Sequence, residues 1–139
     1  MQGRAFLDIA QELANGATEG HWRTAVGRAY YALMLEGRDA LLRWSFTIPP
    51  RENVHTFVRL RFTFAGDPYL KRIGYDLDDL SRLRNQADYR LATAGVFALP
   101  NTASNAVDQA RAAVTLLDQI DGDPSRRAAA IAAIQAAWP

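Results

Sequence analysis

Two arginines stand at positions where the helical pattern of this sequence calls for apolar side chains. Arg84 lies on a stripe with a spacing of three and four residues, as on one face of a helix. The apolar members of this stripe are Ile73, Leu77, Leu80, Ala87 and Leu91. Arg28 interrupts a second stripe, between Thr24 and Tyr31. Because burying an unpaired charge is costly, each guanidinium must contact water or polar partners.

The residues beside these arginines are suited to binding a phosphodiester. They are Tyr30, Tyr31, Asn85, Asp88 and Tyr89. Guanidinium groups, phenols and an amide can hold phosphate oxygens with several hydrogen bonds and can stabilise charge that develops on them. If the two helices are neighbours, we expect a phosphate- or RNA-binding site made of Arg28, Tyr31, Arg84 and Asp88.

A structural role is the alternative for each arginine. Arg84 could pair with Asp88 one helical turn later, an interaction worth about 0.3–0.5 kcal/mol when exposed. Arg28 could pair with Asp88 or with another neighbouring helix. The sequence leaves both alternatives open.

The chain contains two histidines, and His55 is the candidate acid or base because it is expected to face the interior of the helices. Imidazole titrates near neutral pH. A structural role is the alternative here too, and His21, at the start of a predicted helix, is assigned no function.

Metal and cofactor sites of the common kinds are not expected. The chain has no cysteine, which excludes thiolate ligands and cysteine nucleophiles. The histidines lie on different predicted helices, and the glycines form neither a phosphate loop nor a dinucleotide-binding fingerprint. Asp76, Asp78 and Asp79 do not have the spacing of a calcium loop. We therefore predict no metal ion and no cofactor.

The periodicity predicts an all-α fold, an antiparallel bundle of about five helices plus a C-terminal helix. The expected helices are 4–14, 18–44, 52–64, 69–91, 104–120 and 125–138. The second is apolar on nearly every face, which is typical of a central helix. The bundle is assigned to residues 1–121. Residues 122–139 form an additional Ala-rich helix, whose apolar stripe packs on the bundle or on a partner. In the connection 93–102, Val96 and Phe97 are expected to pack down.

The composition indicates an ordinary globular protein of one domain. Of its 139 residues, 49% are hydrophobic and 22% are charged, and the net charge is +1. Such a charge gives no global field for coating nucleic acid, so any RNA contact is expected to be local. No apolar run approaches the roughly 20 residues of a membrane span, and no secretory signal is evident. We expect no membrane association and a cytoplasmic location.

Three segments, in their order and separation, resemble the signatures of the HEPN superfamily, in particular its small stand-alone prokaryotic members. Segment 27–34 contains Arg-x-Tyr-Tyr-Ala, segment 54–62 begins Val-His, and segment 83–89 contains Arg-x-x-Ala-Asp-Tyr. The resemblance covers residues 4–120 and leaves out the last helix. It implies a helical bundle that usually dimerises with its fourth helices facing each other.

The resemblance also implies a chemistry for active members. They are metal-independent endoribonucleases, in which a motif arginine and a histidine shortly after it cleave RNA through attack of the ribose 2′-hydroxyl. Arg84 matches the arginine and Asn85 the polar residue after it, while Tyr89 occupies the position of the histidine. The implied catalytic set is therefore Arg84, Asn85 and Tyr89, with His55 as the candidate for proton transfer.

Tyr89 leaves two hypotheses open, because a phenol titrates near about 10 and is a poor base at neutral pH. In the first, Tyr89 donates a hydrogen bond to phosphate in a ribonuclease of a toxin–antitoxin or antiphage defence system. In the second, the protein is a non-catalytic interaction module. The expected partners are a second copy bound through the fourth-helix face, RNA or nucleotide, and a protein such as an antitoxin, a nucleotidyltransferase or a defence subunit.

Overall fold

A computed structural model describes residues 1–92 and 95–138, in which all the regular secondary structure is α-helical. The helices are α1 (Ala5–Ala14), α2 (Glu19–Arg43), α3 (Val54–Thr63), α4 (Pro68–Tyr89), α5 (Asn101–Asp121) and α6 (Pro124–Ala137). The predicted all-α class, a bundle with an additional C-terminal helix, is confirmed. The first two residues of the predicted connection 93–102, and residue 139, lie outside the described residues.

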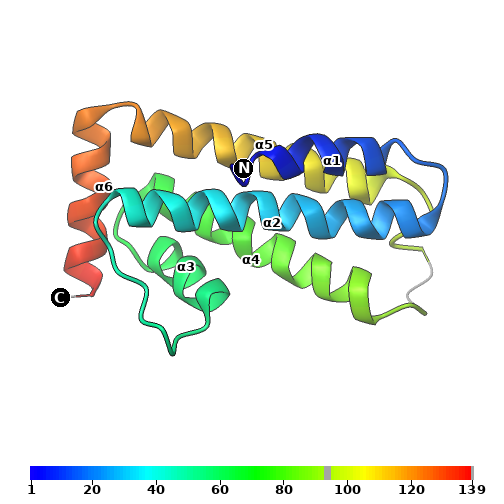
Figure 1. The fold of residues 1–139 in the computed structure, drawn as a ribbon, viewed down its shortest axis with the longest axis horizontal. Coiled ribbons are helices and arrows are strands. Elements are labelled where there is room, and N and C mark those ends of the chain that lie inside the picture. The colour runs from blue at the N-terminus through cyan, green and yellow to red at the C-terminus, as the bar shows by residue number, and fades with distance from the viewer. Residues whose placement is uncertain (93–94, 139) are drawn as a thin grey trace.

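Helices α1, α2, α4 and α5 lie lengthwise beside one another and alternate in direction (Figure 1). Helix α2 is central, because it contacts α1, α3, α4 and α5. Its buried residues occupy most of its circumference, as its apolar sequence predicts. The short α3 packs against α4 and α2, and α6 crosses one end of the bundle (Figure 1).

Local capping explains where several helices begin. The side chains at these starts accept hydrogen bonds from backbone N–H groups that have no partner within the helix. The capping residues are Thr18, Asn53, Asp67 and Asp123. At α4 and α6 the next residue is proline, which has no N–H to satisfy and a backbone angle that suits the first turn.

The predicted end of α4 was wrong. The helix ends at Tyr89, and Leu91, expected on its buried stripe, is 73% exposed. The other apolar members of the stripe are buried. The reason lies in another helix, because the Arg23 guanidinium on α2 donates hydrogen bonds to the carbonyl oxygens of Arg90 and Leu91, just after the helix end. The chain turns around that side chain instead of continuing the helix.

The C-terminal helix packs on its own bundle, which decides between the two alternatives for its apolar stripe. Ile134 is fully buried, and Ile131 and Trp138 are partly buried against the core. The Arg61 guanidinium on α3 lies 4.1 Å from the Phe57 ring centroid and 4.3 Å from that of Trp138. These contacts hold the end of the chain against α3.

In the connection before α5, the predicted packing onto the bundle is found for one of the two residues. Phe97 is fully buried, whereas Val96 is 38% exposed. Within the described ranges, no helix combines the length and apolar character needed to cross a membrane.

Candidate functional site

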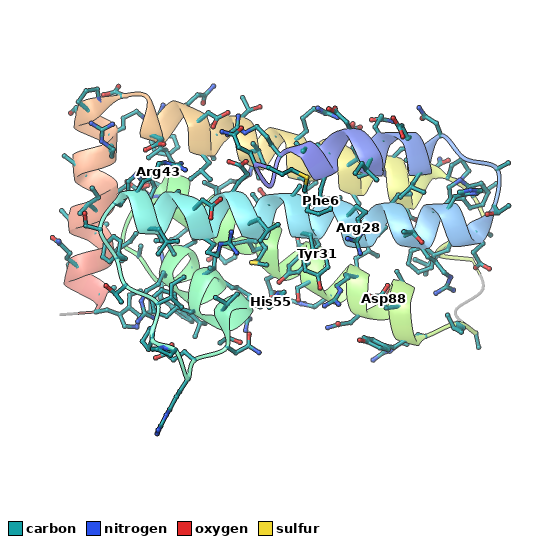
Figure 2. The ribbon with its side chains drawn as sticks, viewed as in Figure 1. Phe6, Arg28, Tyr31, Arg43, His55 and Asp88 are labelled. Carbon is teal, nitrogen blue, oxygen red and sulfur yellow. The ribbon has the colours of Figure 1, made fainter. Side chains whose placement is uncertain are left out.

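Arg28 of α2 and Arg84 of α4 meet at one aromatic ring. The Cζ atoms of Arg28 and Arg84 lie 5.2 and 5.1 Å from the ring centroid of Tyr31. Figure 2 shows Arg28, Tyr31 and His55 along the surface where α2, α3 and α4 adjoin. We call the five residues Arg28, Tyr30, Tyr31, His55 and Arg84 the arginine–tyrosine cluster.

Arg84 is held by two of the partners expected of it. Its Nη2 donates to the Tyr31 hydroxyl at 3.2 Å, and its Nε lies 3.2 Å from Oδ2 of Asp88. The Nε–H is buried and is not aligned with that carboxylate for a hydrogen bond. The intrahelical pair proposed as a structural alternative is therefore present, but it leaves one N–H of Arg84 without an aligned acceptor.

Arg28 lies against aromatic rings rather than beside a carboxylate of the described residues. Its guanidinium is 5.5 Å from the Phe6 ring centroid, in addition to its contact with Tyr31. In residues 1–92 and 95–138, no ion pair joins it to a carboxylate, so the predicted structural ion pair is not observed there. A guanidinium that stacks on aromatic faces keeps its N–H edge available to an anion.

His55 joins the cluster through Tyr30. Its Nδ1 lies 2.7 Å from the Tyr30 hydroxyl oxygen, and the two rings stack with centroids 5.7 Å apart. Burial lowers the pKa of His55, and the positive charge of Arg84 lowers it further. Burial raises the pKa of Tyr30, although the Ser81 hydroxyl and Arg84 oppose that change. At neutral pH the pair is therefore a neutral imidazole and a protonated phenol.

The hydrogen bond between this pair sets which proton transfer His55 can perform. If Nδ1–H donates to the Tyr30 oxygen, Nε2 carries a lone pair and can accept a proton. If the Tyr30 hydroxyl donates to Nδ1, Nε2–H can donate to a phosphate oxygen. His55 thus has a fixed ring orientation and two usable tautomers.

The lowered pKa of His55 gives a testable pH dependence. The unfolded chain, with an ordinary histidine pKa of about 6.5, binds more protons than the folded chain below that pH. The free energy of unfolding should therefore fall as the pH decreases through about 6.5 towards the folded pKa, and be unaffected by His55 above it. In urea denaturation at about pH 7.5 and about pH 5.5, we expect His55→Gln to lose less stability than wild type between the two values. Equal losses would contradict the lowered pKa.

Two predicted catalytic residues do not join the cluster. Tyr89 is 74% exposed, and Asn85 is exposed on another side of α4. In the described part of the chain, no side-chain hydrogen bond, ion pair or ring contact joins either of them to Arg84 or His55. The structure therefore brings together five of the predicted site residues, which are Arg28, Tyr31, His55, Arg84 and Asp88.

Sequence reasoning missed Arg23, an arginine of α2 one turn before Gly27. Its guanidinium donates to the backbone carbonyls of Gln86 at 3.2 Å and Ala87 at 2.9 Å, in the last turn of α4. It therefore positions the turn that carries Asp88. The helical spacing could have identified Arg23 as another buried position on α2. It lies four residues before Gly27 and seven before Tyr30, on the same face of the helix.

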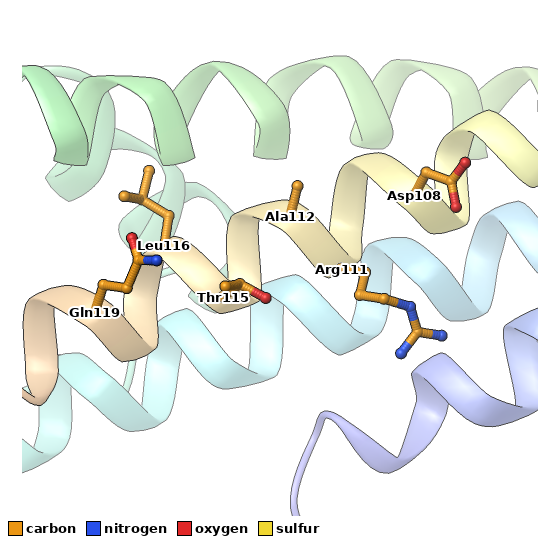
Figure 3. A pocket seen from close by; sticks show the side chains of 6 residues that line it. All are labelled: Asp108, Arg111, Ala112, Thr115, Leu116 and Gln119. Carbon is orange, nitrogen blue, oxygen red and sulfur yellow. The ribbon is translucent and has the colours of Figure 1, made fainter.

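Other surfaces of the molecule carry fewer groups suited to catalysis or ligand binding. A shallow depression of about 400 Å³ lies along the exposed side of α5 (Figure 3). It is lined by Asp108, Arg111, Ala112, Thr115, Leu116 and Gln119. It shares no residue with the arginine–tyrosine cluster. Among the described residues, no three His, Cys, Asp or Glu side chains are grouped so that they could hold a metal ion.

Comparisons of this chain with protein-family models, with curated proteins and with solved structures found no match. Its function is therefore inferred from the residues and geometry of the site.

Proposed function

We propose that this protein is HEPN-like and binds RNA through a phosphate held at the arginine–tyrosine cluster, where it cleaves the strand without a metal ion. One observation carries the proposal. Arg28 is a half-buried guanidinium with no carboxylate partner among the described residues, and it shares the Tyr31 ring with a second guanidinium. Two cations on one ring repel each other, so an anion bound between them would be favoured.

The cluster contains the groups that RNA transesterification needs. The ribose 2′-oxygen attacks the adjacent phosphorus, the bond to the 5′-oxygen breaks, and the products are a 2′,3′-cyclic phosphate and a 5′-hydroxyl. Neutral His55 can take the 2′-hydroxyl proton at Nε2 while Nδ1–H donates to Tyr30, and water supplies the proton to the leaving 5′-oxygen. Arg28 and Arg84 would stabilise the charge that builds on the non-bridging oxygens.

The first test measures binding and cleavage of single-stranded RNA in EDTA. We expect Arg28→Ala to weaken binding about 10- to 100-fold, because charge-assisted hydrogen bonds contribute roughly 1.5–3 kcal/mol each. His55→Gln should keep binding but slow the appearance of cyclic-phosphate ends by about 100-fold or more. Arg111→Ala, an exposed arginine on α5, is the matched control and should change neither. Binding and cleavage that survive unchanged in both cluster variants would overturn the proposal.

A non-catalytic interaction module is the second candidate. Two observations favour it. Tyr89, at the position of the motif histidine, lies outside the cluster, and Arg84 is already paired with Asp88 and hydrogen-bonded to Tyr31. In that case the outer side of α4 would join a second copy of the chain or another protein. Sedimentation would show a dimer, and no cyclic-phosphate ends would form in EDTA.

A further inference from the structure

The outer side of the last two turns of α4 carries an aromatic ring among amides and cations. Arg82, Asn85, Gln86 and Tyr89 recur at spacings of three and four residues and so share this side of the helix. With Arg90, the first three line a shallow pocket of about 250 Å³. The Tyr89 side chain lies beside that pocket in the helical register and is 74% exposed.

We propose that this surface is a nucleobase subsite for the nucleotide adjacent to the phosphate at the arginine–tyrosine cluster. Tyr89 stacks on the base, and the Asn85 and Gln86 amides form hydrogen bonds with the base edge. This inference rests on the proposed RNA binding. It gives Tyr89 and Asn85 a role in recognition in place of the catalytic role that the resemblance implies.

The two sites are close enough for one short RNA strand. Arg84 and Asn85 are consecutive residues, and their side chains leave α4 on different sides. An RNA strand that passes from one side of α4 to the other crosses the width of the helix, about 10–12 Å with side chains. A base on Tyr89 would therefore belong to a near neighbour of the bound phosphate.

The chemistry of this surface favours a base over a second copy of the chain. A two-fold contact between copies would place the arginines of this surface near those of the second copy, where like charges repel. Amides with a guanidinium can bond to base edges, and a tyrosine ring stacks on bases of any sequence. Arg82 forms an ion pair with Asp78, which offsets the positive charge of Arg82. The amides are therefore the main hydrogen-bonding groups of this surface.

Tyr75 offers a matched control on the same helix. It is exposed like Tyr89, but the residues three and four positions later are Asp78 and Asp79. Asp79 would repel a phosphate backbone. The two tyrosines therefore present similar rings, but Tyr89 follows the amides Asn85 and Gln86, whereas Tyr75 has no amide three or four positions before or after it.

The experiment compares a short single-stranded RNA with the same strand carrying one abasic nucleotide at each position in turn, using fluorescence anisotropy at one fixed salt concentration. Tyr89→Ala should weaken binding of the intact RNA about 5- to 100-fold, the loss expected for one stacked base. Tyr89→Phe keeps the ring and should stay within about threefold of wild type. Tyr75→Ala should have no effect, and one abasic position should abolish the difference between wild type and Tyr89→Ala.

The outcomes separate this inference from the proposed function. If Arg28→Ala weakens binding and Tyr89→Ala does not, the subsite is overturned and the phosphate site stands. If wild type binds no RNA, both are overturned. If Tyr89→Ala instead converts a dimer to a monomer in sedimentation and leaves RNA affinity unchanged, the surface is a protein interface. Tyr89→Ala should fold, because the residue is exposed at the end of α4.

Discussion

Replacing Gly74 with alanine is expected to lower the free energy of unfolding by about 3 kcal/mol. A Cβ at this position of α4 would lie 2.5 Å from the backbone nitrogen of Thr63 and 2.6 Å from its Cα. Because the obstacle is backbone, no side-chain rotation can relieve the clash, and α3 must move away from α4. That movement would also separate His55 from Arg84, so under the proposed function RNA cleavage should fall together with stability.

Gly66 provides the matched control for this substitution. It lies between α3 and α4, and a Cβ there would meet no atom within 4 Å. Gly66→Ala should therefore change the free energy of unfolding by less than about 0.5–1 kcal/mol, with a gain as the favoured sign. Urea denaturation of both variants checks the comparison. Equal stability of Gly74→Ala and wild type would show that α3 and α4 do not depend on this close approach.

Replacing Arg23 with methionine should have an effect of similar size, a loss of about 2–4 kcal/mol. The Arg23 side chain is buried, and its Nη1 donates to three backbone carbonyls, the shortest bond being 2.9 Å to that of Ala87. Its Cζ lies 4.4 Å from the Phe97 ring centroid. Methionine fills much of the volume but donates no hydrogen bond, so the carbonyls at the end of α4 lose their partner and the favourable cation.

Hydrogen exchange can also show where in the chain Arg23→Met loses stability. Hydrogen exchange should become faster in the last turn of α4 than in its first turns, because the lost donor acts at that end. Arg111→Met, on the exposed side of α5, should stay within about 0.5 kcal/mol of wild type. A variant of Arg23 with wild-type stability and exchange would mean that water satisfies those carbonyls equally well.

Most of the fold could be predicted because its signals are local. Capping residues such as Thr18 and Asp67 begin helices through their own backbone contacts, and Asp67 is followed by proline. The end of α4 could not be predicted in the same way. It depends on Arg23, a residue more than sixty positions earlier in the chain, and the apolar spacing alone continued the helix to Leu91.

The sequence predicted which residues form the candidate site better than it predicted how they are arranged. An arginine on an apolar stripe must find partners, and this reasoning selected both Arg28 and Arg84. It could not show that Asp88 pairs with Arg84 while Arg28 stays without a carboxylate in the described residues. Tyr89 was chosen by its place in a motif, and motif spacing says nothing about whether a side chain at a helix end faces a neighbour or solvent.

By itself, therefore, the sequence determined where the helices lie, that α2 is central, and which polar residues needed an explanation. Only the tertiary structure decided that Arg28 and Arg84 share the Tyr31 ring, that His55 bonds to Tyr30, and that Tyr89 faces outward. The physical reason is the range of the interactions. Periodicity and caps act within a few residues, whereas these contacts join side chains from different helices and depend on the register and angle at which the helices pack.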